Sequence, residues 1–281
     1  MLYGAIAAVV IAVLIVVAIV LPSLGPGAPS TPSGAITYGQ AAPGSNYSVR
    51  SFHGYTNWSL LFVVGLDPSA ATTTSAALGD LGVSNCTLAP SPGVSGNLTV
   101  PAFTGSLTSG HAPLWEFFYQ NFSSQAVAIV AVENGTVTVL GTISSPECTD
   151  VFSIIDPIPA HVLDSPTIGA AVAASASAFL SAHPGASAVY GLIGPVFSSF
   201  PVENIPPKWV VEFSTCALST SPSGLGAEYN ATINAVTGAQ IHAQSVSSFA
   251  CASDPPAAAA LGPLHAALAA SHASRALPSA R

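Results

Sequence analysis

Apolar positions along the chain fall into two patterns. Residues 2–21 form one apolar run, and within it residues 5–20 contain no charge and no helix breaker. About 20 apolar residues, at a rise of about 1.5 Å each, cross a bilayer as a helix. Everywhere else Ser, Thr, Gly or Pro interrupts each apolar run within the length of a strand. The pattern predicts a single membrane-spanning segment, residues 1–22, followed by a body of short elements.

A cleaved signal peptide is the alternative interpretation of this first segment. Such peptides have a basic leading region and an apolar core of about 7–15 residues. Here no Lys or Arg precedes the core, and the core is longer, which favours a retained anchor. Ala28-Pro29-Ser30 nevertheless offers a small-residue cleavage site, so both interpretations stay open.

Alternation in the body predicts two β-hairpins. In residues 127–139 two β-rich runs flank Asn134-Gly135, and residues 229–241 have a similar turn around Thr237-Gly238. Asn-Gly between such runs is a strong two-residue turn signal. A strand that begins with tryptophan precedes each hairpin, at residues 115–119 and 209–213.

Helices are expected ahead of both tryptophan strands. Asp67-Pro68 precedes a segment rich in Ala, Thr and Ser that runs to Gly82, and Asp164-Ser165-Pro166 precedes residues 170–183. An Asp cap followed by proline is a common helix start. The same order of cap, helix, Trp strand, hairpin, Ser-Ser pair and Cys occurs twice, which suggests an internal duplication.

These elements predict an α+β fold class: an N-terminal transmembrane helix, then two repeated units, each a helix packed on an antiparallel sheet. The expected organisation is an anchor at 1–22, a Pro/Gly/Ser-rich stalk at 23–46, a first unit at 47–152, a second unit at 153–253 and an Ala-rich tail at 254–281.

Charge is scarce in this sequence. Charged residues make up 6% of the chain, against roughly 25% in an average soluble protein. The net charge is -8, and Lys208 is the only lysine. Nucleic-acid binding needs clustered Lys and Arg to neutralise phosphates, and the chain has no such cluster. Nucleic acids are therefore excluded as partners.

Asparagines point to export of the body. Seven of the nine stand in Asn-X-Ser/Thr triplets. These are Asn46, Asn57, Asn85, Asn97, Asn121, Asn134 and Asn230. A composition rich in Ser and Thr would also produce some of these triplets by chance. Their excess over that expectation favours a glycoprotein whose C-terminal body is extracytoplasmic. The expected localisation is the cell membrane, with a single pass.

The cysteines agree with an oxidising compartment. There are four, Cys86, Cys148, Cys216 and Cys251, without CxxC or Cys/His metal spacing. Two disulfide bonds are expected. Pairing within each unit, Cys86 with Cys148 and Cys216 with Cys251, is the simplest arrangement, although three connectivities are possible.

The second unit resembles the PepSY-like family of exported domains. The likeness lies in a helix, the Trp209–Phe213 strand and residues 229–241, with Asn234 where the family usually has aspartate. It covers about 90 residues, and its turn motif is short. The resemblance implies a binding or inhibitory module that acts with an exported peptidase and has no catalytic residues. The overall plan is also similar to archaeal membrane-anchored surface proteins, and a pilin-like filament subunit is a minor alternative.

No catalytic or metal-binding pattern stands out. The histidines lack HExxH or similar spacing, and no nucleophile elbow or phosphate-binding glycine loop occurs. Glu116 and Glu212 lie on the two Trp strands and could form the acid pair of an exported hydrolase, but outward-facing strand positions explain them more simply. The expected protein is therefore a non-enzyme without cofactors, with a binding or envelope-structural role, whose partners are the membrane and another envelope protein or an exported peptidase.

Overall fold

The structure is a computed structural model. It describes residues 31–52, 57–75, 89–91, 94, 97–144, 149, 152, 155–199, 202–216 and 225–250. The expected anchor, the first part of the stalk and the Ala-rich tail lie outside these ranges.

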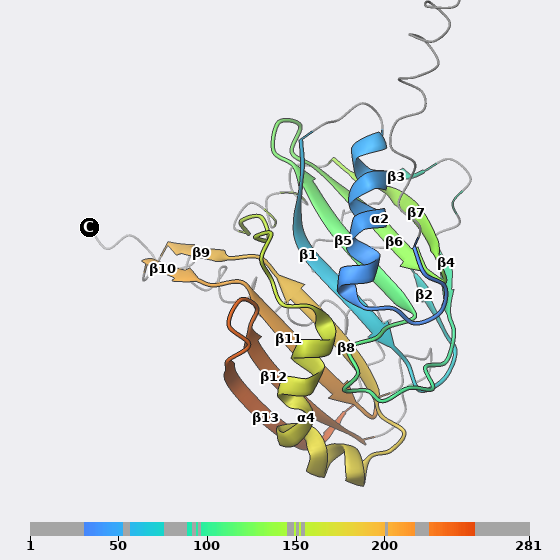
Figure 1. The fold of residues 1–281 in the computed structure, drawn as a ribbon, viewed down its shortest axis with the longest axis vertical. Helices are drawn as coiled ribbons and strands as arrows, with labels where there is room; N and C mark the ends of the chain where they lie inside the picture. Colours follow the sequence, from blue (N-terminus) through green and yellow to red (C-terminus); the bar gives the residue numbers. More distant parts are fainter. Residues whose placement is uncertain are drawn as a thin grey trace, which may run out of the picture.

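One antiparallel sheet of nine strands forms the body of the described chain, in the order β13-β12-β11-β8-β1-β5-β6-β7-β3 (Figure 1). Its strands are β1 (Trp58–Asp67), β3 (Ala89–Pro90), β5 (Leu114–Asn121), β6 (Ala126–Glu133), β7 (Thr136–Ile143), β8 (Ser187–Ile193), β11 (Lys208–Ser214), β12 (Leu225–Asn234) and β13 (Gln240–Ala250). Two small hairpin-like pairs accompany it, β2 (Thr72–Ser75) with β4 (Asn97–Val100) and β9 (Val196–Ser199) with β10 (Val202–Ile205).

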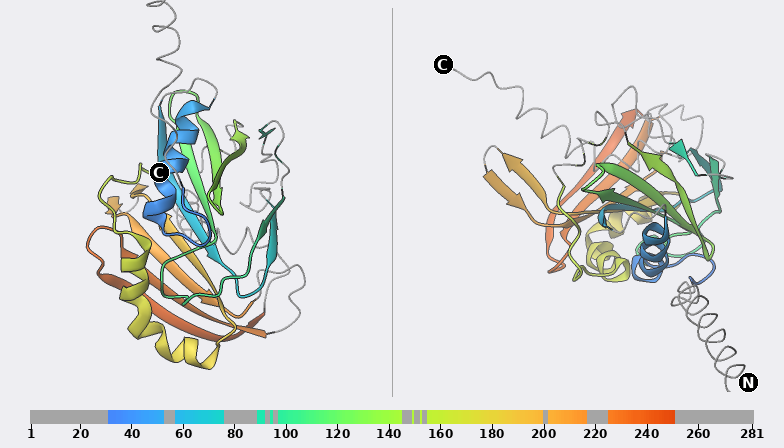
Figure 2. Two further views of the ribbon diagram at one scale, coloured as in Figure 1. Left: turned by 45° about the vertical axis from the view of Figure 1, so that its right-hand side comes forward. Right: turned by 90° about the horizontal axis from the view of Figure 1, so that it is seen from above.

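Both described helices, α2 (Tyr38–Ser51) and α4 (Ser165–Ala182), lie on the same face of this sheet (Figure 2). Helix α2 crosses β5, β6 and β7, and α4 crosses β11, β12 and β13. A single hydrophobic core between the sheet and the helices contains residues from both halves of the chain. A second core covers the opposite face around β1, β5 and β6.

Helix α2 begins at a capping box. Thr37 accepts a hydrogen bond from the Gln40 backbone N–H, and the Gln40 side chain accepts one from the Thr37 N–H. The helix buries small residues, including Ala41 and Ser45, which lets it lie close to the strands. Its sequence contains Pro43 and little apolar periodicity, so packing against the sheet rather than helix propensity stabilises it.

Helix α4 buries larger apolar side chains than α2 does. Ile168, Val172, Ala176 and Phe179 recur at helical spacing and are buried against the sheet. The segment is also long and apolar enough to span a membrane by composition alone. Its buried stripe on the sheet identifies it as a core helix of the body.

The centre of the sheet joins the two halves of the chain. Strands β1 and β8 pair antiparallel from Phe62 opposite Ile193 to Asp67 opposite Ala188. Both strands are nearly continuous apolar runs, as expected for strands covered on two faces. We call this β1–β8 pairing the seam. The sheet continues across the seam without an edge.

Two tryptophans meet beside the seam. The rings of Trp115 and Trp209 pack edge to face with their centroids 6.4 Å apart. Trp115 Nε1 donates to the Ile36 carbonyl at 2.8 Å, and Trp209 Nε1 donates to the Leu163 carbonyl at 3.0 Å. Each acceptor lies just before a helix, so the two rings tie both helix starts to the sheet. Gly65 is required under Trp115, because a Cβ there would lie 2.6 Å from the ring.

The predicted α+β fold class of two repeated helix-on-sheet units is wrong. The chain does run twice from a helix through a strand and a Trp strand to a hairpin, but both sets of strands belong to one sheet. The error arose because edge-to-edge pairing of β1 and β8 joins residues more than a hundred positions apart, which no local pattern reveals.

The expected first helix was also placed wrongly. Residues 72–75 form strand β2, and residues 76–88 lie outside the described ranges. Asp67, expected to cap that helix, is the last residue of β1. The helix of the first half is instead α2, which includes residues 38–46 of the expected stalk.

Both hairpin predictions are confirmed. Strands β6 and β7 pair around Asn134-Gly135, where both residues have positive φ, as a type I′ turn requires. Strands β12 and β13 pair around Thr237-Gly238, and Gly238 has a φ of 73°. The Trp strands and the helix after Asp164 are confirmed as β5, β11 and α4.

Candidate functional site

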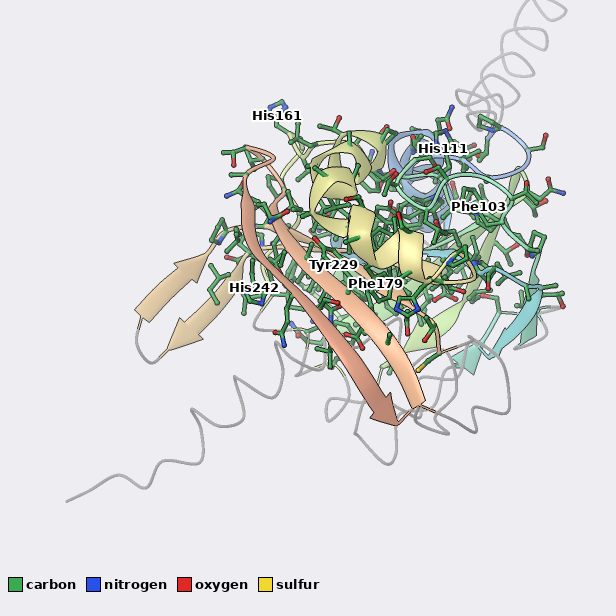
Figure 3. All side chains as sticks on the ribbon, turned by 90° about the horizontal axis from the view of Figure 1, so that it is seen from below. Phe103, His111, His161, Phe179, Tyr229 and His242 are labelled. Atoms are coloured by element: carbon green, nitrogen blue, oxygen red, sulfur yellow. The ribbon has the colours of Figure 1, made fainter. Side chains whose placement is uncertain are left out.

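An open pocket of about 970 Å³ is the candidate functional site. Its walls come from three separate segments: residues 34–35 before α2, the connection from Thr99 to Pro113, and the β6–β7 turn at Glu133 and Asn134. Phe103 and His111 lie near each other at this end of the sheet, far from His161 and His242 (Figure 3).

The long wall of the pocket, residues 99–113, is held from several sides. The Phe103 N–H donates to the Pro68 carbonyl at 2.8 Å, which holds the first part of the segment 99–113. Ser165 Oγ donates to the Gly110 carbonyl at 2.5 Å, and Tyr190 Oη donates to the Leu107 carbonyl at 2.5 Å. These bonds fasten the segment to α4 and β8, so the pocket wall is positioned by the sheet.

The opposite wall depends on the β6–β7 turn. Asn134 Oδ1 accepts a hydrogen bond from the Gly34 N–H at 2.9 Å. A short antiparallel bridge between Ile36 and Ala112 then brings the segment before α2 against the long wall. The type I′ turn therefore joins the segment before α2 to the β6–β7 hairpin at this wall of the pocket.

His111 has a defined orientation in the pocket. Its Nδ1 lies 3.1 Å from the Ser109 carbonyl oxygen. A carbonyl only accepts hydrogen bonds, so we assign the ring proton of the neutral form to Nδ1. Nε2 is then left as a hydrogen-bond acceptor. His111 is half-buried, and the backbone of its own loop holds the ring.

Glu133 is the acidic residue of the pocket wall. It ends β6 directly before the turn and is half-buried. Burial raises the pKa of its carboxyl above the usual range, which favours the uncharged acid. The rest of the lining consists of hydroxyl, amide, backbone and apolar groups together with the Phe103 ring. Glu133 is therefore the only carboxyl among the described residues that line the pocket.

Two lining residues that can take part in catalysis, His111 and Ser106, are not paired with each other. The His111 ring is hydrogen-bonded to the Ser109 carbonyl of its own loop, and Ser106 Oγ lies 3.1 Å from Thr108 Oγ1. Ser106 and His111 therefore do not form a nucleophile–base pair. Within the described ranges, no three His, Cys, Asp or Glu side chains gather closely enough to hold a metal ion.

The two acids on the Trp strands do not come together. Glu116 on β5 and Glu212 on β11 are separated by β1 and β8 in the sheet. Three strand spacings amount to about 14 Å, whereas paired glycosidase carboxyls are about 5–9.5 Å apart. Both lie on the sheet face opposite the helices and are more buried than expected: burial raises the pKa of Glu116 to about 7, and burial together with nearby Glu228 raises that of Glu212 to about 8.

Asp67, which the sequence suggested as a helix cap, is instead a buried carboxyl, and the next residue, Pro68, bonds the pocket wall at Phe103. Asp67 has no exposed surface, and neither carboxylate oxygen has a hydrogen-bond partner. Burial raises the pKa of the Asp67 carboxyl well above the usual range. The nearby backbone N–H groups of Asp67 and Ala188 lower this pKa, but only in part, because neither forms a well-formed hydrogen bond with the carboxyl. We infer that Asp67 is a neutral acid in the core.

The glycosylation candidates differ in accessibility. Asn57 and Asn134 are exposed, whereas Asn121 is buried and its Oδ1 accepts from the Ser123 and Ser124 N–H groups. Asn46 is half-buried and accepts from Tyr119 Oη. Asn230 is half-buried and its amide donates to Glu228. Asn97 lies on β4, and Asn85 lies outside the described residues.

Of the cysteines, Cys216 falls in the described part of the chain, and it is disulfide-bonded. Cys86, Cys148 and Cys251 lie outside that part, so the pairing expected from the sequence stays a prediction.

Comparison with known proteins adds no family to this picture. No protein-family model matches the chain, and neither curated proteins nor solved structures include a significant match to it.

Proposed function

We propose that the chain is a non-catalytic, membrane-anchored extracytoplasmic protein that binds a small uncharged ligand in the pocket between residues 99–113 and the β6–β7 turn. The observation that carries the proposal is the pocket itself, which is assembled from three distant segments and held open by bonds to the sheet. Support for the location comes from the apolar run at 2–21 and the seven sequons.

The ligand class follows from the lining. Apart from the Glu133 carboxyl and the His111 ring, the lining consists of groups without formal charge. Hydroxyl groups such as Thr104 surround the Phe103 ring. An aromatic face next to hydroxyl and amide groups suits a polar, uncharged molecule with one apolar face, and neutral sugars have this character.

A binding screen tests this proposal with a matched pair of aromatic variants. The full chain in detergent is titrated with neutral mono- and disaccharides and with short uncharged peptides by calorimetry. We expect at least one class to bind, and Phe103→Ala to weaken it about tenfold through loss of the ring contact. Phe122→Ala, at an exposed aromatic of the β5–β6 turn, should bind as the wild type does. Absence of binding by every probe, or equal loss in both variants, would contradict the proposal.

Regulation of an exported peptidase is the second candidate role. The feature that favours it is the consecutive packing of α4, the Trp strand β11 and the β12–β13 hairpin, the segment that carries the PepSY-like resemblance. Slowing of a secreted peptidase of the same host by the full chain would support this role, and unchanged proteolysis would remove it.

A further inference from the structure

Strand β13 forms one border of the nine-stranded sheet. It is 11 residues long and, among the described residues, pairs with β12 alone (Figure 1). The opposite border is formed by β7 and by the two-residue strand β3, which contains Pro90 and pairs with β7 only opposite Thr142 and Gly141. Among the described residues, β13 is therefore the longer border strand and has no partner on its outer side.

Two of the features that normally protect an open edge, charged residues and proline, are missing from β13. Natural edge strands carry charged residues, especially lysine, or proline and bulges that prevent another strand from pairing. Residues 240–250 contain no Lys, Arg, Asp, Glu or Pro. The register with β12 shifts near both ends of the strand, but from His242 to Ser247 it is regular.

We propose that β13 pairs antiparallel with β13 of a second copy of this chain, so that the two sheets become one continuous sheet. Antiparallel pairing of two identical strands is two-fold symmetric, which is the commonest symmetry of homodimers. The outward N–H and C=O groups of each strand supply the hydrogen bonds that its partner needs.

The uncharged edge allows two copies of this acidic chain to meet without repulsion between facing side chains. The chain has a net charge of -8, so most pairs of surfaces from two copies bring like charges together. Strand β13 is an exception, because its side chains are uncharged apart from the titratable His242. The exposed side chain of Ile241, which is 58% accessible, adds apolar area at the same edge.

The sheet already contains an edge-to-edge pairing of this kind. Strands β1 and β8 bring the two halves of the chain together edge to edge in an antiparallel ladder. The proposed dimer repeats that arrangement between two molecules. The two-fold axis of the dimer lies at Gln244 or Ser245, in the middle of the regular stretch. The residue at the axis then faces the same residue of the second copy.

Native mass spectrometry of the full chain in detergent tests the dimer. We expect a concentration-dependent dimer that Gln244→Lys weakens about tenfold, because the substitution places two like charges across the two-fold axis at an exposed position. Ser177→Lys adds the same charge on the exposed face of α4 and should leave the dimer unchanged.

Hydrogen exchange of β13 amides provides the second measurement. We expect slow exchange across the middle of β13 in the dimer and fast exchange of the outward amides when Gln244→Lys shifts the chain to monomer. Three results would overturn the proposal: a wild-type monomer up to its solubility limit, a dimer that Gln244→Lys leaves unchanged, or protected β13 amides in a monomer, which would mean that another segment of the chain covers the edge.

Discussion

Acidification through the neutral range is expected to stabilise the protein. Glu116 and Glu212 have pKa values of about 7 and about 8, raised from the usual value of 4.5, mainly because burial disfavours the charged carboxylate. The charge of Glu228 adds to the effect at Glu212. A carboxyl with a raised folded-state pKa holds its proton more tightly when folded than when unfolded.

The sign of the effect follows directly. Below the unfolded pKa both states are protonated, and the stabilising contribution is complete. As the pH rises toward about 8, the unfolded state gives up its protons first, so the free energy of unfolding falls. After allowance for solvent access to each carboxyl, we expect a loss of about 2 kcal/mol per residue, or roughly 10 °C in Tm for the pair.

Calorimetry across this pH range, at constant ionic strength, checks the prediction. Glu116→Gln and Glu212→Gln should each flatten the fall of Tm with pH, because glutamine has a similar shape and does not titrate. At the acid end of the range each variant should unfold at the wild-type temperature, which is an internal control. A Tm that is constant or rises with pH would show that these carboxyls are solvated.

Removal of the Asp164 carboxylate is expected to destabilise the whole fold. Asp164 caps α4 by accepting from the Ser165 N–H at 2.8 Å. The same carboxylate accepts from the Gly39 N–H at 2.7 Å and from Thr37 Oγ1 at 2.8 Å, at the start of α2. One side chain therefore bonds the N-termini of both helices, next to the seam between the two halves.

Asp164→Ala should lower the free energy of unfolding by about 3 kcal/mol, because it removes a helix cap and two further hydrogen bonds to a charged group. Asp164→Asn keeps an acceptor oxygen and should lose about 1 kcal/mol. Thr37→Ala breaks the α2 capping box as well as its bond to Asp164, and we expect an intermediate loss. Urea unfolding of the three variants measures this order, and an alanine variant equal to the wild type would contradict it.

Local signals predicted one helix and both hairpins. Asp164 with Pro166 after it predicted α4, and Asn134-Gly135 and Thr237-Gly238 predicted the two hairpins. Helix α2 was missed because Pro43 and its small and polar residues resemble a linker, and the Thr37-x-x-Gln40 capping box was the signal that could have found it.

Long-range structure was beyond such signals. The β1–β8 seam pairs Val63 with Leu192, and the pocket brings Gly34 next to Asn134. The unbroken apolar runs of β1 and β8 did contain a hint, because a strand covered on both faces belongs at the centre of a sheet. The high pKa values of Glu116 and Glu212 depend on what covers that face, which strand alternation does not reveal.

The outward position of the body is the central claim, and Lys208 provides its most direct test. It is the only lysine of the chain, it is half-buried on β11, and burial lowers its pKa, which increases the fraction of reactive neutral amine. A membrane-impermeant amine reagent is added to intact host cells and to permeabilised cells, with Lys208→Arg as the negative control. If the body lies outside the membrane, the Lys208 peptide is labelled equally in intact and permeabilised cells. Labelling only after permeabilisation would place the body inside the cell.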